Sequence, residues 1–126
     1  MKNIVVAVSL FVVILLLSFF SIRYLNKTCN KFLSLSNKIQ TSLQNGSYSK
    51  ADLYLKSFEK DWYKHSSILS VFIHHMEVDD ISLEVERLSQ AIKYKEKKDA
   101  MESSHTLSFL IEHVSSLEEI NLENIF

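Results

Sequence analysis

The sequence predicts an all-α protein in which an N-terminal transmembrane helix continues into an antiparallel four-helix bundle of two helical hairpins. First, the run Ile4–Ile22 contains no charged residue, no Gly and no Pro. Second, the chain of 126 residues has one Gly and no Pro, which disfavours tight β-hairpins and Pro-rich linkers. Third, apolar residues beyond the run recur in steps of three and four, the period of an amphipathic helix.

The apolar run is long enough to cross a bilayer. At 1.5 Å per residue it forms a rod of roughly 28 Å, close to the thickness of the hydrocarbon core. Lys2 before the run resembles the start of a secretory signal. The run is longer than the apolar core of such a signal, however, and Arg23 and Tyr24 follow where small residues would be needed for cleavage. We therefore expect residues 1–23 to be an uncleaved signal-anchor of a single-pass cell-membrane protein.

The first helix is expected to continue from the bilayer to about Leu43 without a linker. Gly46 then ends it, because glycine adopts the positive φ found at many helix C-termini. Residues 24–118 would form the bundle domain, and residues 119–126 a C-terminal tail. The apolar seam of this helix comprises Leu25, Cys29, Phe32, Ser36, Ile39 and Leu43.

The second helix is predicted from about Lys50 to His75. Ser49 and Asp52 resemble the capping box that starts many helices. Trp62 lies on the apolar seam and is expected in the core. The seam comprises Ala51, Leu55, Phe58, Trp62, His65, Leu69, Phe72 and Met76, and a flanking stripe of Tyr54, Ile68 and Val71 should widen the buried face.

The last two helices form the second hairpin. The segment Met76–Asp80 is predicted to be the turn before the third helix, with Asp79 or Asp80 as its cap. The fourth helix is predicted to start at Asp99, with Glu102 completing a capping-box-like pair, and to end at about Leu117. Inward positions are Ile81, Val85, Leu88 and Ile92 on the third helix and Leu107, Leu110, Ile111 and Val114 on the fourth.

The charges are unevenly distributed along the chain. From Arg23 to Lys50 there are basic residues and no acid, and every Asp and Glu lies from Asp52 onward. This order suggests a basic part near the membrane and an acidic part far from it. Basic residues beside a span attract anionic head groups, by about 1 kcal/mol each, but a solvated Lys-rich helix gives the same pattern. An acidic distal surface would repel phosphate, which disfavours nucleic-acid binding.

No catalytic, cofactor or metal site is assigned from the sequence. No serine or cysteine lies in a nucleophile motif, so we expect no enzyme. A metal-binding or sensor domain at His74, His75 and the neighbouring acids Glu77, Asp79 and Asp80 is the alternative function. Adjacent helical residues point about 100° apart, however, so His74 and His75 cannot easily share one ion.

The other histidine roles follow from helix position. We expect His75 to lie at a helix end, where it would interact with the dipole. His65, on the apolar seam, is expected to be a core residue whose partner is a backbone group or a carboxylate, with Glu112 as one candidate. Cys29 is the only cysteine, so no intramolecular disulfide can form.

Several sequence segments of the chain resemble the uncharacterised DUF 4363 family of low-GC Gram-positive bacteria. They are Tyr24–Thr28, the Trp62 region, His74–Asp80, Phe109–His113 and the ending Asn121–Phe126. The resemblance implies a small single-span membrane protein of unknown activity, with no catalytic residue to carry over. It also implies a membrane partner, a multi-span protein of another uncharacterised family (DUF 421).

These observations together predict a membrane-anchored binding or accessory protein that acts with another membrane protein. Its expected partners are membrane lipid and the multi-span protein, with no nucleic acid, small-molecule substrate or cofactor. The candidate partner surface comprises Glu118, Glu119, Ile125 and Phe126, in which the acids set the association rate and the apolar residues supply the lasting contact.

The orientation of the domain rests on two opposed signals. The signal-like start favours an extracytoplasmic bundle. The positive-inside count, with Arg23, Lys27, Lys31 and Lys38 after the span, favours a cytoplasmic one. We expect the extracytoplasmic orientation.

Overall fold

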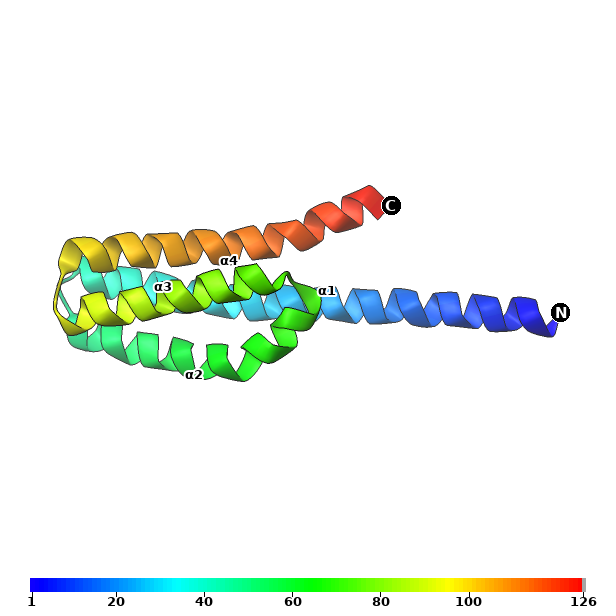
Figure 1. Cartoon of the computed structure of the whole chain (residues 1–126), viewed down its shortest axis with the longest axis horizontal. Coiled ribbons are helices and arrows are strands. Elements are labelled where there is room, and N and C mark those ends of the chain that lie inside the picture. Colours follow the sequence, from blue (N-terminus) through cyan, green and yellow to red (C-terminus); the bar gives the residue numbers. More distant parts are fainter. Residues whose placement is uncertain (126) are drawn as a thin grey trace.

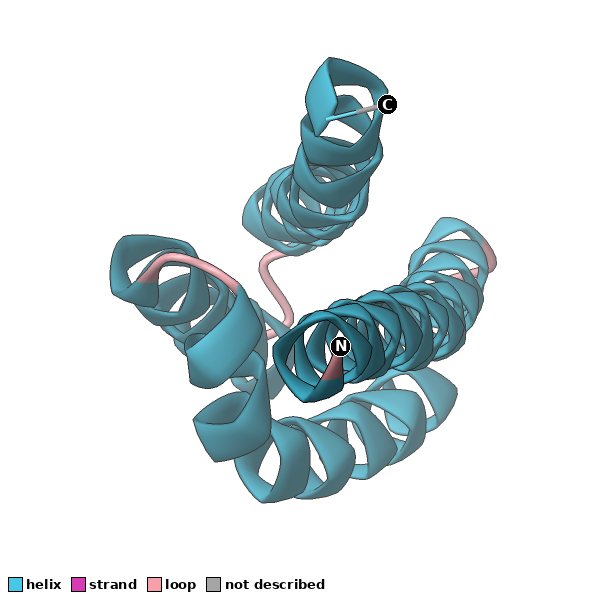
Figure 2. Ribbon diagram, turned by 90° about the vertical axis from the view of Figure 1, so that its right-hand side faces the viewer, coloured by secondary structure: helices cyan, strands magenta, loops and turns pink. Residues whose placement is uncertain are grey.

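The computed structural model describes the backbone of residues 1–125 and the side chains of residues 1–117. This part of the chain forms four helices joined by short turns: α1 (Lys2–Gln44), α2 (Tyr48–Phe72), α3 (His75–Lys93) and α4 (Lys97–Ile125). Each helix packs against the next, and α4 returns to pack against α1 (Figure 1). Viewed from the end that α1 leaves, the helices surround a common centre (Figure 2). The all-α fold and the bundle predicted from the sequence are confirmed.

The helix α1 is a single unbroken rod of 43 residues with two different parts. Every residue from Met1 to Phe20 is exposed, and burial begins at Ser21 and Ile22, which are half-buried. In the part of the chain that the structure describes, α1 is the one helix long and apolar enough to cross a membrane. The predicted seam is confirmed, since all of its members are buried: Leu25, Cys29, Phe32, Ser36, Ile39 and Leu43.

The centre of the bundle is aromatic. Trp62 is only 2% exposed, which confirms its predicted place in the core. Its ring centroid lies 5.4 Å from that of Phe32 and 6.3 Å from that of Phe58. The indole Nε1–H donates to Ser82 Oγ at 2.8 Å, so the one polar atom of the ring is satisfied inside the core.

The contact between α1 and α4 is more polar. Ser36, the polar member of the α1 seam, lies 2.6 Å from Ser108 of α4, measured between the two Oγ atoms. Farther along the same contact, Gln40 Nε2 lies 2.9 Å from His105 Nδ1. The hydroxyl pair satisfies Ser36 where it is fully buried, so the interruption of the seam is accommodated without an unpaired polar group.

The start of α2 differs from the prediction, because the turn after α1 is tighter. Gly46 has φ +72°, and the N–H of Ser47 bonds to the carbonyl of Ser42 at 2.8 Å. The helix then begins at Tyr48, so the predicted capping box of Ser49 and Asp52 is wrong. Asp52 instead pairs with Lys56, one turn on, at 2.7 Å.

The turn between α2 and α3 is also earlier than predicted. Ile73 is extended (φ −120°, ψ 159°), and the Nδ1 of His74 accepts from the N–H of Met76 at 3.3 Å. His74 is therefore the cap of α3, and the predicted caps Asp79 and Asp80 lie inside that helix. His75 begins α3, at the positive end of its dipole, so the expected favourable interaction of His75 with a helix dipole is wrong.

The α4 helix is longer at both ends than the prediction. It begins at Lys97, after Lys95 has taken a positive φ of 55° in the turn, and it continues to Ile125 rather than ending near Leu117. Asp99 lies in the first turn and is not the cap. The predicted inward positions hold: Ile81, Val85, Leu88, Ile92, Leu107, Ile111 and Val114 are buried, and Leu110 packs against the core.

Candidate functional site

The end of the bundle from which α1 emerges is the region that distinguishes this structure. The burial of α1 begins at Ser21, one residue before the apolar run ends at Ile22. The α2–α3 turn lies at this same end, and the α1–α2 and α3–α4 turns lie at the opposite end (Figure 1). We call these the span-side end and the far end. No spacer separates the span-side end from the apolar run.

The span-side end is held together through Tyr24. A hydrogen bond of 2.8 Å joins its hydroxyl to Nδ1 of His65 on α2. The Tyr24 ring also lies 6.2 Å from the His65 ring and 6.4 Å from the Phe72 ring, measured between centroids. His65 is half-buried, and its partner is a phenol, so the expected pairing with a backbone group or with Glu112 is wrong.

The histidines and acids near the α2–α3 turn form pairs rather than a cluster. His75 Nε2 lies 3.9 Å from Asp79 Oδ2, and His113 Nε2 lies 3.9 Å from Glu77 Oε1. His74 already accepts a backbone N–H as the α3 cap. Among the residues that the structure describes, no three His, Cys, Asp or Glu side chains come together as a metal site.

Four exposed apolar side chains surround the α2–α3 turn, and we call them the span-side patch. They are Ile68, Val71, Phe72 and Met76. All four were predicted to be buried, as part of the α2 seam or its flanking stripe, and this prediction is wrong. Leu69 and Ile73 form the buried face at this end of α2, so Ile68, Val71 and Phe72 lie beside that face, and Phe72 keeps its contact with Tyr24. Met76 is exposed because it lies beyond the break, in the first turn of α3.

The far end carries charges of both signs. Tyr48 Oη donates to the carbonyl of Lys95 at 3.4 Å, which joins the α1–α2 turn to the α3–α4 turn. This end carries Lys50, Lys93, Lys95, Lys97 and Lys98 together with Asp52, Glu96 and Asp99, whereas Glu77, Asp79 and Asp80 lie near the span-side end. The expected order of a basic proximal part and an acidic distal part is therefore wrong. The antiparallel helices bring lysines to the far end and acidic residues to the span-side end.

The predicted partner surface falls outside the described side chains. The backbone of Glu118, Glu119 and Ile125 belongs to the last turns of α4, which run back toward the span side (Figure 1). Their side chains, and the whole of Phe126, lie outside the described part of the chain. The surface stays a prediction, now assigned to the span side.

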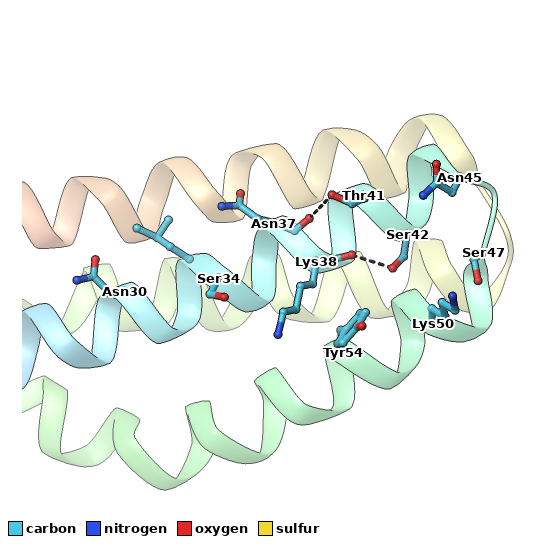
Figure 3. Close-up of a pocket in the computed structure, with 11 residues that line it drawn as sticks. Asn30, Ser34, Asn37, Lys38, Thr41, Ser42, Asn45, Ser47, Lys50 and Tyr54 are labelled. Atoms are coloured by element: carbon cyan, nitrogen blue, oxygen red, sulfur yellow. Dashed lines mark hydrogen bonds between the residues drawn. The ribbon is translucent and has the colours of Figure 1, made fainter.

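An open groove of about 630 Å³ lies between α1 and α2 toward the far end (Figure 3). Lys38 crosses it, with Nζ 5.7 Å from the centroid of the Tyr54 ring. Two of its hydroxyls are engaged within α1, since Thr41 donates to the Asn37 carbonyl and Ser42 to the Lys38 carbonyl. No His, Cys, Asp or Glu is among the described residues that line the groove, so these residues offer no set of metal ligands.

Four groups in the bundle have shifted pKa values, namely Cys29, Lys56, Glu59 and Asp61, and two of them lie on α1 or are paired with it. Burial raises the pKa of the Cys29 thiol to about 11, which leaves it protonated at neutral pH. The hydrogen bond from Lys31, at 2.7 Å, lowers the pKa of Asp61. Both are explained by packing and pairing within the bundle, and neither group adjoins a reactive partner.

The comparisons with known proteins agree with this helical structure. A family model described as "Domain of unknown function (DUF4363)" matches residues 19–125, which include the last turn of the apolar run and the described bundle. No curated protein and no solved structure matches the chain. The family match confirms the resemblance that the five sequence segments suggested. The chain belongs to the DUF4363 family.

Proposed function

We propose that this chain is a single-pass membrane protein whose bundle binds another protein of the same membrane as an accessory subunit. The observation that carries the proposal is the continuity of α1. Its exposed apolar part and its buried seam belong to one helix of 43 residues, with burial beginning at Ser21. A bilayer around Ile4–Ile22 would hold the bundle directly against the head groups.

Such a direct attachment suits recognition within the membrane better than capture of soluble ligands. A bundle held at the bilayer surface meets membrane partners at a fixed height, which raises the effective concentration of its surface for them. The resemblance that implies a multi-span partner points the same way. In this proposal the last turns of α4, with Glu118, Glu119, Ile125 and Phe126, form the partner surface beside the span.

The proposed orientation is extracytoplasmic, because a short charged N-terminus before an apolar run is handled as a secretory start. The opposing count of Arg23, Lys27, Lys31 and Lys38 makes a direct test necessary. Cys29 cannot report the orientation, because it is buried. A Leu83→Cys variant places a thiol on the exposed surface of α3. A membrane-impermeant thiol reagent should label it in intact protoplasts, and labelling confined to lysed cells would reverse the orientation.

The binding role is tested by purifying the chain, tagged at its N-terminus, from its own membranes in mild detergent. We expect a multi-span membrane protein to copurify. Reversing Glu118 and Glu119 to Lys, or deleting residues 124–126, should reduce its recovery. The matched control reverses Glu102 and Glu112 to Lys, since both are exposed on the same helix and the change in charge is equal.

The outcomes separate the surface from the function. If both surface variants fold and still recover the partner at high salt, the proposed surface is wrong and the binding role stands. If the intact chain recovers no membrane protein, the binding role itself loses its support. The alternative metal or sensor role predicts instead that Zn²⁺ raises the melting temperature, and that a His74→Ala, His75→Ala variant abolishes the rise.

A further inference from the structure

We propose that the span-side patch is a second membrane contact, in which Ile68, Val71, Phe72 and Met76 insert into the head-group boundary of the leaflet from which α1 emerges. This inference rests on the proposed function only in that α1 must span a bilayer. It assigns a lipid-binding role to residues that the α1 anchor does not include.

The height of the patch follows from the contacts of α1. The apolar run ends at Ile22, and Tyr24, two residues later, packs its ring 6.4 Å from the ring of Phe72. Because α2 runs antiparallel to α1, the residues after His65 continue toward the apolar run (Figure 1). A bilayer whose hydrocarbon covers α1 up to Ile22 therefore brings its head groups to the α2–α3 turn.

The side chains at this turn suit the boundary between head groups and acyl chains. Val71 is 78% exposed and Met76 is 65% exposed. Large apolar side chains with this exposure seldom gather in one patch on a soluble protein. Residues 65–76 include no Lys, Arg, Asp or Glu, although such residues flank the stretch on both sides. The hydroxyl of Ser70 donates to the carbonyl of Ser67 at 2.8 Å, which lowers the cost of bringing it out of water.

Charges of both signs flank the patch, with Glu77, Asp79 and Asp80 after it on α3 and the cations Arg23 and Lys64 on α1 and α2. Arg23 follows the apolar run and places its guanidinium 5.3 Å from the Phe19 ring centroid, so the charge lies beside the end of the run. Lys64 precedes the uncharged stretch on α2. Basic and aromatic residues at one level are typical of membrane interfaces.

Lipid is the occupant that the geometry favours over a protein. The patch is continuous with the apolar run through Tyr24, and nothing separates the bundle from that run along α1. A protein partner would have to enter between the bundle and the bilayer to cover the patch. The bilayer reaches it with no further component.

The test uses the purified full chain in proteoliposomes, which contain no partner protein. Single cysteines carry a spin label at Val71→Cys in the patch, Leu53→Cys on the same helix toward the far end, and Leu10→Cys in the apolar run. Leu53 is the matched control, because it is 63% exposed on α2. The native Cys29 stays in place, since it is buried, and the unsubstituted chain is labelled in parallel as a blank.

The measurement is the collision rate of each label with oxygen, which concentrates in lipid, and with a water-soluble nickel chelate. We expect the oxygen-to-nickel ratio at Val71 to exceed that at Leu53 several-fold and to lie below that at Leu10. Met76→Cys should repeat the Val71 result from the other side of the turn.

Each other outcome overturns a different statement. If Leu10 is deep and Val71 matches Leu53, the second contact is absent while the anchor stands. If Val71 is shielded from both reagents, protein and not lipid covers the patch, and the lipid contact is wrong. If Leu10 itself is accessible to the chelate, α1 does not span the bilayer, and both the anchor and the second contact fail.

Discussion

Replacing Trp62 tests the core on which the whole bundle depends. Trp62→Ala removes a side chain that is 2% exposed and that contacts Phe32 and Phe58. Large-to-small changes at buried aromatic sites cost about 3–5 kcal/mol. Because domains of this kind have about 5–15 kcal/mol of unfolding free energy in total, the variant should lose a large part of its stability, with a clearly lower urea midpoint.

A second substitution separates the hydrogen bond from the packing. Trp62→Phe keeps an aromatic ring but removes the Nε1–H that donates to Ser82 Oγ. Ser82 still donates to the Val78 carbonyl at 2.8 Å, so no buried donor is left without a partner. We expect a loss of about 0.5–1.5 kcal/mol for the hydrogen bond and about 1 kcal/mol for the volume left empty.

The assay is urea denaturation of the full chain in non-ionic detergent, followed by far-UV circular dichroism. Fluorescence is unsuitable, because Trp62 is the only tryptophan. The apolar run should stay helical in the micelle, so the transition reports the bundle. Tyr63→Ala, at a neighbouring position 60% exposed, is the control and should change stability by no more than about 0.5 kcal/mol. Equal midpoints for Trp62→Ala and Tyr63→Ala would refute the proposed core.

Three further predictions concern the span, a carboxyl and the thiol. A chain lacking residues 1–20 loses the exposed apolar part of α1. It should therefore be soluble by sedimentation and helical by circular dichroism. Aggregation of this shortened chain would show that the bundle needs the bilayer or a partner. Glu59→Gln should raise the melting temperature at pH 7 and leave it unchanged near pH 3, with the exposed Glu102→Gln as control. Burial, and then the charge of Glu86, raise the pKa of Glu59 above its ordinary 4.5. The ionised form of Glu59 therefore destabilises the fold only as the pH rises through that range. An equal rise in melting temperature at both pH values would contradict this cause. Cys29 should resist alkylation in the native protein at pH 8 and react fully in denaturant, as followed by mass spectrometry, because it is buried with a pKa of about 11; rapid native reaction would show that the α1 seam opens.

The sequence predicted the helices and most of the core, because burial along a regular helix follows a simple period. The seam from Leu25 to Leu43 is an example, since each of its members is buried as the steps of three and four require. Trp62 followed from the same period on α2. Even the polar member Ser36 was placed correctly, although its partner Ser108 could not be found from local sequence.

The turn between α2 and α3 was misplaced for a local reason. Aspartate is a common helix cap, so the start of α3 was predicted at Asp79 or Asp80. In the structure the cap is His74, through its ring nitrogen, and the extended Ile73 takes over the buried face. This shift of a few residues also leaves Met76, predicted on the α2 seam, exposed in the first turn of α3.

The candidate site depended on long-range information that the sequence does not carry. The order of charges along the chain suggested an acidic far end, but the antiparallel path brings Lys95 to the far end and Glu77 close to the span. The pairing of Tyr24 with His65, 41 positions apart, likewise depends on how two helices align. The exposed patch could have been suspected only from the uncharged stretch of residues 65–76.

The continuity of α1 also makes the bundle a lever. From Ile22 to Gln44 the helix extends about 33 Å beyond the apolar run, at 1.5 Å per residue. If the span inclined by about 20°, an ordinary angle for transmembrane helices, the far end would swing sideways by about 11 Å. A change in membrane thickness or in the packing of a neighbouring helix alters that inclination. Either change would therefore displace the far end of the bundle, around Lys95 and Lys97.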